Sequence, residues 1–443
     1  MVNPPHQPVI VIGAGVSGLL LAQHLRERQI PFRVFERDLG HAYRGVGWGL
    51  SLHWSLPAVR SLLPEDLVRR LPEAYVDRLA VENGESSAFP FFDLASGELV
   101  AKTPKAPESD RIRVSRQRLL QILATGIDIQ WRKAFTKYES TGDDSITASF
   151  SDGSSCVGTL LVACDGSNSR VRRQLFPNEH ENRPLPVRLM GVKIDVSPEQ
   201  IEPLRQLDPF FFQGASSEND SFMYFSILDA PANNDERSDM YTCQIVVSWP
   251  FRPGFLGNPS PTPVPPTNEG RLDLLCILAK TWAEPFQSLV LGIPPGTEVK
   301  TLDLADWPPP RGAHGTDRVV LMGDAFHTMT MYRGEGANHA ILDVLDFADI
   351  VSPCLRGPEG NNTARGNSST TDIDDKAEAI AIDGGAAGLR AALDGYEDAV
   401  IARARAGVLA SRRACLDAHD WGKIGPGSPL LSRREPRLLF DEE

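Results

Sequence analysis

The chain opens with an apolar stretch that leads directly into three spaced glycines, Val9-Ile10-Val11-Ile12-Gly13-Ala14-Gly15-Val16-Ser17-Gly18. Four consecutive apolar residues before a glycine turn are typical of a buried parallel strand. Residues 19–28 then have helical composition, and residues 32–35 read as a second strand. The stretch therefore predicts a βαβ unit, which usually opens a doubly wound α/β sheet.

The three glycines have the spacing GxGxxG, and Glu36 follows 18 residues after the last of them. In such a turn Gly13 permits the tight bend, Gly15 lets a pyrophosphate approach the backbone, and Gly18 lets the helix pack on the strand. The helix N-terminus faces the phosphates, and Glu36 would accept hydrogen bonds from a ribose. This segment predicts a dinucleotide site but leaves NAD and FAD open.

A second segment, far along the chain, narrows that choice. Gly323-Asp324-Ala325-Phe326-His327 follows the strand-like run at residues 318–322, which is apolar after Arg318, and Gly334-Glu335-Gly336-Ala337-Asn338 comes shortly after it. Asp324 would lie at the carboxyl end of a buried strand, where its carboxylate could bind the hydroxyls of a ribityl chain. The helix expected at 337–350 would direct its positive N-terminus at the anion of a reduced flavin. The two segments together predict bound FAD.

Composition excludes several other classes of protein. The 443 residues carry a net charge of −13, which argues against a nucleic-acid partner or an anionic membrane surface. The six cysteines show neither CxxC nor metal-ligand spacing, so we expect reduced thiols and a cytoplasmic protein. Residues 7–25 are uncharged, but no Lys or Arg precedes them and their glycines have nucleotide-loop spacing. We therefore expect neither a signal peptide nor a transmembrane segment.

The apolar patterns divide the chain into a cofactor part and an inserted part. Runs such as Phe222–Phe225 and Gln244–Val247 predict an antiparallel or mixed sheet, and residues 258–270 hold five prolines and predict a surface loop. We expect an α/β fold with these units: a Rossmann-like FAD-binding domain at 1–75, 106–184 and 301–356; an inserted substrate-binding sheet domain at 76–105 and 185–300; a disordered insertion at 357–385; C-terminal helices at 386–425; and a tail at 426–443.

Several ordered motifs extend this pattern over most of the chain. They are Gly13–Gly18 with Glu36-Arg37; Gly47–Leu52; Arg116 with Leu119 and Leu120; Asp165–Ser169 with Arg172; Gly323-Asp324; and Tyr396-Glu397. With these motifs the chain resembles the single-component, group A, FAD-dependent aromatic monooxygenases of the para-hydroxybenzoate hydroxylase type. It is most similar to the fungal enzymes that modify aromatic, polyketide or alkaloid metabolites.

The resemblance implies a role for each matching position. Glu36 and Arg37 would hold the adenosine end of tightly bound FAD, Gly49 would lie beside the isoalloxazine, and Arg116 would lie against the flavin and its phosphates. The rest of the cradle would be Asp324, Gly336, Ala337 and Asn338. The Asp165-Gly166 segment is linked in this family to both FAD and NAD(P)H, which fits the absence of a second GxGxxG unit and implies that NAD(P)H docks transiently.

One position departs from the family pattern. Similar proteins carry a proline four residues after the histidine of the GDxxH segment, where this chain has Met331. Met331 keeps a backbone carbonyl at that position but lacks the fixed φ of proline. The geometry on the oxygen-reacting side of the flavin is therefore the part of the family pattern that carries over least directly to this chain. We interpret His327 as structural or close to the flavin, with no metal site. His53 and Trp54 would either line the pocket or pack in the core.

The resemblance implies an oxygenase reaction in secondary-metabolite biosynthesis. NAD(P)H would reduce FAD, O2 would add at C4a, and the resulting hydroperoxide would hydroxylate or epoxidise an electron-rich aromatic, indole or polyketide-type small molecule. Arg188 and Tyr224, on expected strands of the inserted sheet, are candidates for favouring a phenolate. Two alternatives remain open at this point: a flavin-dependent dehydrogenase or reductase on the same fold, and a binding protein that has lost catalysis.

Overall fold

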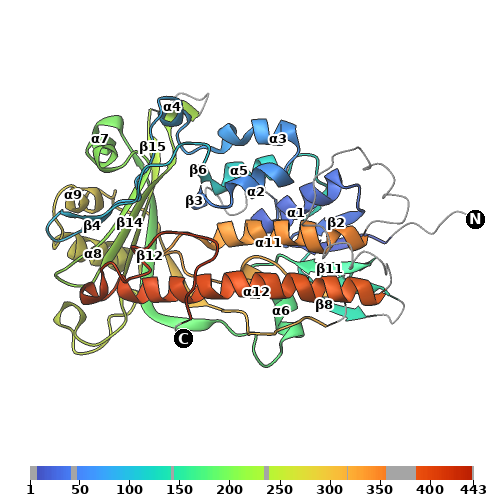
Figure 1. Ribbon diagram of the computed structural model, residues 1–443. Coiled ribbons are helices and arrows are strands. Elements are labelled where there is room, and N and C mark those ends of the chain that lie inside the picture. Colours follow the sequence, from blue (N-terminus) through green and yellow to red (C-terminus); the bar gives the residue numbers. More distant parts are fainter. Residues whose placement is uncertain are drawn as a thin grey trace, which may run out of the picture.

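The computed structural model describes residues 7–40, 47–140, 144–233, 239–316, 318–355 and 386–441. The disordered insertion expected at 357–385 lies outside the described residues. Within the described ranges the chain forms two large sheets with helices between and around them (Figure 1). This arrangement confirms the α/β fold class with an inserted sheet.

The N-terminal stretch forms the centre of a five-stranded parallel sheet, as its apolar composition predicts. The strand order is β17 (Val319–Leu321), β11 (Leu160–Ala163), β1 (Val9–Ile12), β2 (Phe32–Phe35) and β7 (Ile129–Gln130). Val9 pairs with Phe32 on one side and with Leu160 on the other. All four residues of β1 are buried, which is why the strand has no polar position.

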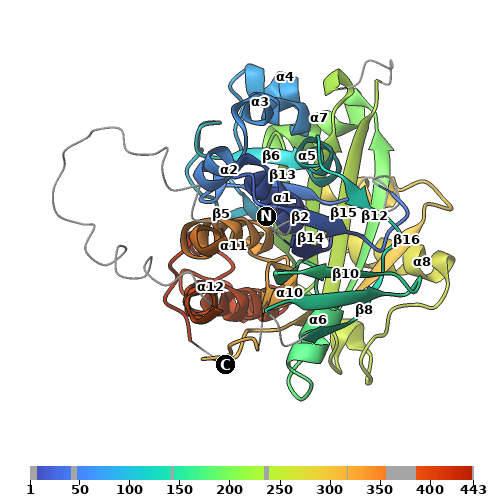
Figure 2. The same cartoon turned by 90° about the vertical axis from the view of Figure 1, so that its right-hand side faces the viewer.

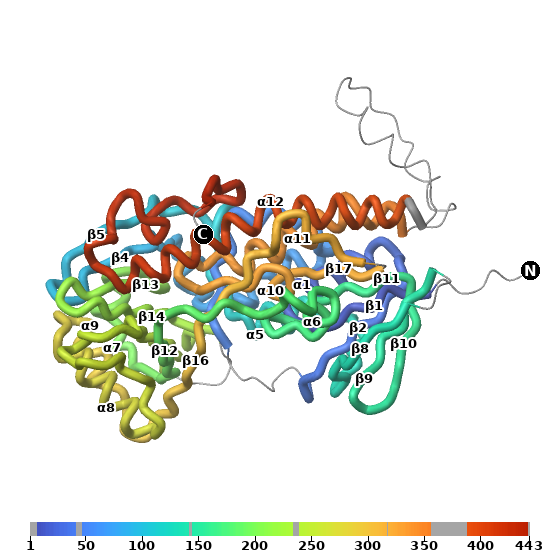
Figure 3. The backbone as a smooth tube through the Cα atoms, turned by 90° about the horizontal axis from the view of Figure 1, so that it is seen from below, coloured from blue at the N-terminus to red at the C-terminus, as the bar shows by residue number. Residues whose placement is uncertain are grey.

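The two faces of the parallel sheet have different covers. On one side, helix α1 (Val16–Glu27) packs against both α5 (Arg116–Leu123) and α11 (Gly336–Ile350). On the other side lies an antiparallel sheet of β8 (Phe135–Ser140), β9 (Ile146–Phe150) and β10 (Ser155–Gly158), seen beside β1 and β2 in Figure 3. The rings of Phe35 and Phe150 stack there at 4.4 Å. The sequence patterns did not predict this small sheet.

The inserted part forms a seven-stranded sheet whose long strands are prominent in Figure 2. Its order is β16 (Val299–Asp306), β12 (Arg183–Val196), β15 (Tyr241–Pro250), β14 (Phe222–Asp229), β13 (Phe211–Ala215), β4 (Phe91–Asp93) and β5 (Leu99–Ala101). Every neighbouring pair is antiparallel except β13 and β4, so the sheet is mixed.

Three helices share a hydrophobic core with this sheet: α7 (Pro198–Leu207), α8 (Asn268–Ala279) and α9 (Phe286–Leu291). They were not predicted, since prolines at 198 and 203 and the proline-rich run before residue 268 obscure the helical period. The loop expected at 258–270 ends at Thr267, whose hydroxyl accepts from Gly270 N and caps α8. The predicted boundary between residues 300 and 301 falls inside β16, and the domain limits remain predictions.

A single helix of 32 residues, α12 (Ala386–Asp417), runs alongside both sheets (Figure 1). The sequence predicts C-terminal helices at 386–425, and residues 386–417 of that range form one continuous helix. Near one end Tyr396 Oη donates to Leu321 O of β17 at 3.0 Å, and near the other Arg412 Nη2 contacts Asp306 Oδ1 of β16 at 2.6 Å. These two bonds attach α12 to the parallel sheet and to the seven-stranded sheet.

The remaining described elements are short. They are β3 (Gly49–Leu52) paired with β6 (Ile112–Ser115), α2 (Leu56–Leu62), α3 (Glu65–Arg69), α4 (Arg78–Glu82), α6 (Arg170–Leu175) and α10 (Asp324–His327). None of the helices described for this chain is both long and apolar enough to span a bilayer. All six cysteines are free thiols.

Candidate cofactor and substrate site

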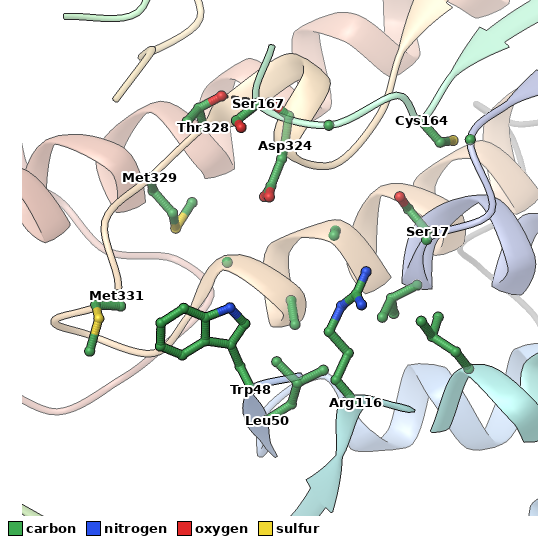
Figure 4. A pocket seen from close by; sticks show the side chains of 18 of the residues that line it. Ser17, Trp48, Leu50, Arg116, Cys164, Ser167, Asp324, Thr328, Met329 and Met331 are labelled. Atoms are coloured by element: carbon green, nitrogen blue, oxygen red, sulfur yellow. Dashed lines mark hydrogen bonds between the residues drawn. The ribbon is translucent and has the colours of Figure 1, made fainter. Parts of the chain in front are cut away.

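One cavity of about 580 Å³ runs between the parallel sheet and the seven-stranded sheet. Its volume lies in the usual range for small-molecule sites. One end is lined by the turn after β1, and the other by aromatic residues of β13 and β14. Figure 4 shows the middle of the cavity, where Arg116 and Asp324 point into it from different elements. Segments more than 300 residues apart therefore share a single site.

The glycine turn after β1 has the geometry that the spacing predicts. Gly13 has φ +106°, and a Cβ there would lie 2.2 Å from the backbone oxygen of Cys164, the residue that follows β11. A Cβ on Gly18 would lie 2.1 Å from Gly13 O, so this glycine lets α1 pack on the turn, although it does not line the cavity. Gly15 lines the cavity and has no atom within 4 Å of the Cβ position. The open space at Gly15 is where a pyrophosphate would approach.

The end of the cavity at which the adenosine is expected is shaped by the residues that follow β2. Glu36 Oε2 accepts from Ala14 N at 2.8 Å, and Oε1 accepts from Asp38 N at 3.0 Å. The carboxylate is thus fixed against the glycine turn, and each oxygen keeps a lone pair for a ribose hydroxyl. Arg37 also lines the cavity.

Asp165, two residues after the end of β11, has a carboxylate oxygen without a hydrogen-bond donor among the described residues. Its Oδ2 accepts from Arg170 N at 2.8 Å, whereas Oδ1 is buried without a hydrogen-bond partner among the residues that the structure describes. Burial raises the pKa of this carboxyl group above its usual value. Since a buried acceptor without a partner is costly, the position fits a ligand hydroxyl or amide at this wall of the cavity.

Asp324 and Arg116 meet across the centre of the cavity (Figure 4). Asp324 begins α10 at the end of β17, and its carboxylate faces the open space. Loss of contact with water raises the pKa of the Asp324 carboxyl group above its usual value, and the charges of His327 and Arg116 oppose that rise. A Cβ on Gly336 would lie 3.9 Å from Asp324 Oδ1, so the N-terminus of α11 comes close to this carboxylate.

The first turn of α11 supplies two lining residues and one anchor. Gly336 and Ala337 line the cavity, but Asn338 lies behind it and is fully buried. Asn338 Nδ2 donates to Ser51 O at 2.9 Å, and Oδ1 accepts from Ser55 Oγ at 2.7 Å. Asn338 therefore ties β3, which carries the lining residue Gly49, to the helix N-terminus.

A buried ionic network below the cavity escaped the sequence analysis. Asp343 of α11 accepts from Gly323 N at 2.7 Å, from His327 Nε2 at 2.7 Å and from Arg403 Nη2 at 2.8 Å. The charges of His327 and Arg403 hold the pKa of Asp343 well below its usual value. The sequence did offer one signal for this network: Asp343 stands between apolar residues in the helix expected at 337–350. The network supports a structural role for His327, and the described residues contain no group suited to hold a metal.

The end of the cavity far from the glycine turn is aromatic and cationic. Phe89, Phe211 and Tyr224 line it together with Arg113 of β6, which the sequence did not identify. Arg113 Nη2 donates to Tyr224 Oη at 2.5 Å, so the predicted tyrosine does lie in the site. Arg188 does not line the cavity: its guanidinium lies 3.6 Å from the centre of the Phe251 ring. The geometry brings Tyr224 to the site and leaves Arg188 outside it.

Three further positions can now be located. Met331 lines the cavity, and its carbonyl accepts from Gly334 N at 2.9 Å. His53 and Trp54 do not line the cavity, and the Trp54 ring packs edge-on at 5.0 Å from His339. Burial, with the charge of Arg434 adding to it, lowers the pKa of His53 to about 3. Of the two alternatives for His53 and Trp54, the structure favours packing beside the site.

FAD fits the residues of this cavity. Two helix N-termini, those of α1 and α11, face it and suit the pyrophosphate and the flavin ring respectively. The free Oδ1 of Asp165 and the space at Gly15 provide a hydrogen-bond acceptor and room for close approach. The predicted assignment of individual residues to FAD stays a prediction, because it rests on this fit.

Comparison with known proteins agrees with the fit. Residues 312–364 match the FAD binding domain family. A probable FAD-dependent monooxygenase of Arthroderma benhamiae is 42% identical over 98% of this chain and 96% of its own length. The FAD-dependent monooxygenase dbaB of Emericella nidulans is 37% identical over 76% of this chain and 85% of its own length. The FAD-dependent monooxygenase tazP of Aspergillus terreus is 33% identical over 80% of this chain and 92% of its own length.

Solved structures share the fold at lower identity. The 2,6-dihydroxypyridine-3-hydroxylase of Arthrobacter nicotinovorans superimposes with a TM-score of 0.69 at 19% identity, covering 100% of this chain and 99% of its own. The HpxO protein of Klebsiella pneumoniae, solved with FAD and uric acid, has a TM-score of 0.64 at 21% identity, covering 95% of this chain and 91% of its own. These likenesses support the fold alone.

Proposed function

Since this chain belongs to the FAD-dependent monooxygenase family, we propose that it uses NAD(P)H and O2 to hydroxylate or epoxidise an electron-rich aromatic, indole or polyketide-type small molecule. One observation carries the proposal: a single cavity joins the glycine turn at Gly13–Gly18 to an aromatic chamber at the seven-stranded sheet. The chamber is the part of the cavity lined by Phe89, Phe211, Phe222 and Tyr224. A ring held in that chamber would lie next to a flavin held by the N-terminus of α11.

FAD, when bound and reduced, supplies the activation of oxygen expected from the resemblance, and the protein supplies binding, orientation and exclusion of water. In this proposal Gly15 and Glu36 bind the nucleotide, and Asp324 fixes the ribityl chain opposite Arg116. Tyr224 Oη accepts a hydrogen bond from Arg113 at 2.5 Å, and in this proposal it would donate its own proton to a substrate oxygen. The aromatic walls would keep water away from the reacting atoms.

The finer parts of the proposal rest on the chain as a whole. The chain has one GxGxxG unit, at residues 13–18, which supports transient docking of NAD(P)H at the same cavity instead of a second nucleotide domain. Relatives that carry the name FAD-dependent monooxygenase favour catalysis over a protein that only binds. A role in secondary metabolism and a cytoplasmic location belong to the proposal as well.

The direct test follows the flavin and the oxygen atom. We expect the purified protein to be yellow, to be reduced by NADH or NADPH without air, and to place one atom of 18O2 in a product when aromatic and indole substrates are supplied. Absence of label from every product across the whole panel, with the consumed oxygen recovered as hydrogen peroxide, would reject oxygen insertion.

One observation keeps a second candidate function in view. Met331 replaces the proline expected on the oxygen side of the flavin, and its carbonyl is engaged by Gly334 N at 2.9 Å. A flavin-dependent dehydrogenase or reductase would tolerate that change, because it transfers hydride without inserting oxygen. Such an enzyme would oxidise its substrate under 18O2 without label in the product, so the same experiment separates the two.

A further inference from the structure

The C-terminal segment Ser428–Arg434 forms part of the cavity wall. Arg434 lines the cavity, although the segment follows α12 and belongs to neither sheet. The segment is anchored by Arg333, which is 2% exposed and whose Nη1 donates to Pro429 O and, at 2.8 Å, to Ser432 Oγ. Arg333 Nε in turn contacts Glu335 Oε2 at 2.6 Å. The loop that leads into α11 therefore holds the tail in place.

Arg434 brings a cation to the chamber, and no carboxylate in the described residues accepts a hydrogen bond from it. The charge of Glu335 acts on Arg434, but that carboxylate is already paired with Arg333. Arg434 Nη1 donates to Ser432 O and its Nη2 to Leu430 O, both at 3.1 Å, so only backbone carbonyls accept from these two nitrogens. Within the described part of the chain it forms no ion pair. Its guanidinium carbon lies 5.7 Å from the centre of the Phe89 ring. Burial, and the charge of Arg333 next, lower the pKa of Arg434 to about 10, which leaves it charged near neutrality.

Arg113 is a second cation in the same chamber, and it is also balanced only by neutral groups. It is 9% exposed, and its nitrogens donate to Ser51 Oγ at 3.0 Å, to Ser226 Oγ at 2.8 Å and to Tyr224 Oη. Its Nε is buried and has no hydrogen-bond partner among the described residues. The guanidinium carbon lies 5.0 Å from the centre of the Phe211 ring.

The residues around Arg113 and Arg434 supply little negative charge that is not already paired. Arg111 adds a third guanidinium group, 4.4 Å from the centre of the Phe89 ring, and the carboxylate of Glu335 is paired with Arg333. The carboxylate whose charge acts on Arg111 is Asp208. Its oxygens already accept hydrogen bonds from the backbone N of Ala88, Phe210 and Phe211. Unbalanced charge inside a protein is expensive, so an arrangement with two such cations fits a ligand that brings the negative charge.

We propose that Arg113 and Arg434 bind an anionic oxygen of the substrate, and that the substrate is an aromatic compound with an ionised acidic group, either a carboxylate or an acidic phenol. The ring would lie among Phe89, Phe211 and Phe222, and the charged oxygen between the two guanidinium groups. Arginine suits this task because its fixed fork of donors matches oxygen anions. The inference rests on the proposed function and adds the charge class of the substrate.

Binding of small probes to the FAD-loaded protein tests this directly, without turnover. Calorimetry at pH 8 would compare benzoate with benzamide, and 4-nitrophenol, ionised at that pH, with 4-nitroanisole. We expect at least one anion to bind about tenfold or more tightly than its neutral analogue. The pair that shows the preference identifies the carboxylate or the phenolate as the recognised group.

Variants then assign the preference to residues. Arg434→Gln should reduce the preference for the anion over its neutral analogue to below threefold, and Arg434→Lys should keep most of that preference. The matched control is Arg433→Gln, at the exposed neighbouring residue, which should leave the preference unchanged. Arg113→Gln should act like Arg434→Gln, and the tail variants keep the test valid if that buried change impairs folding. Equal affinity for anions and neutral analogues, no binding of any probe up to 10 mM, or an unchanged preference in Arg434→Gln would each overturn the inference. Flavin content and 18O2 incorporation report separately on the proposed function.

Discussion

The three glycines of the N-terminal turn make a sharp prediction, because their surroundings differ. Gly13 has a positive φ of +106° and a backbone oxygen 2.2 Å from the position of a Cβ. Gly15 has no atom within 4 Å of that position and serves as the N-cap of α1 with φ −80°. We expect Gly13→Ala to damage the fold itself. Gly15→Ala should leave the flavin-free fold intact and block the approach of the FAD pyrophosphate.

The expected magnitudes separate the two variants clearly. At Gly13 a non-glycine residue with positive φ costs about 1–3 kcal/mol, and forcing a methyl group against a backbone carbonyl adds about 1–3 kcal/mol. Their sum is a large part of a typical stability of about 5–15 kcal/mol. At Gly15 the change from glycine to alanine at an N-cap costs roughly 1 kcal/mol or less. Affinity for FAD should fall about 100-fold or more in Gly15→Ala, which corresponds to about 2.7 kcal/mol.

Thermal unfolding of the flavin-free proteins and titration with FAD, followed by quenching of flavin fluorescence, measure both effects. Gly425→Ala is the matched control, since Gly425 also has nothing within 4 Å of a Cβ and does not line the cavity. It should melt and bind FAD like the wild type. The reasoning is refuted if Gly15→Ala binds FAD with wild-type affinity, or if it melts as early as Gly13→Ala.

Three further predictions concern the support of the site. On α12, Gly395→Ala should stabilise the protein by about 0.5–1 kcal/mol, because the added Cβ would lie 3.7 Å from the nearest atom. Gly407→Ala should destabilise it by about 1–2 kcal/mol, because the Cβ there would lie 2.4 Å from the buried His339 Nε2 of α11. Denaturant unfolding measures both changes. Burial lowers the pKa of His419 from 6.5 to about 4, so its stabilising contribution is complete above pH 6.5 and is lost as the pH falls toward 4. Melting curves across that window should show a weaker pH dependence in His419→Gln, and an unchanged slope would contradict this. Asp343→Asn should cost about 3–5 kcal/mol and weaken FAD binding, whereas Asp346→Asn, at a side chain 28% exposed, should cost far less in the same unfolding and titration assays.

The sequence was sufficient where one local pattern determines one local structure. The strand at 9–12, the glycine turn and the return strand at 319–321 each follow from apolar runs and glycine spacing, and the fold class follows from them. The small sheet of β8–β10 was not predicted, because β8 does not alternate and the alternation of β9 and β10 covers only five and four residues. Helices α8 and α9 were missed for a related reason: the prolines before them dominate the local signal.

The substrate end could not be derived in this way, because its residues come together only through tertiary packing. Arg113 lies in a strand of two-residue alternation, and nothing in the sequence shows that its side chain turns toward Tyr224 on a strand more than 100 residues away. Arg434 lies in a segment that composition alone describes as a tail. It reaches the cavity because Arg333, in the loop before α11, holds that segment by its backbone carbonyls. The residues that would bind FAD are thus encoded by local motifs, while those that would select the substrate depend on how the C-terminus closes over the seven-stranded sheet. Relatives that keep the glycine turn but differ in the tail should therefore share the cofactor and differ in the acidic group that they recognise.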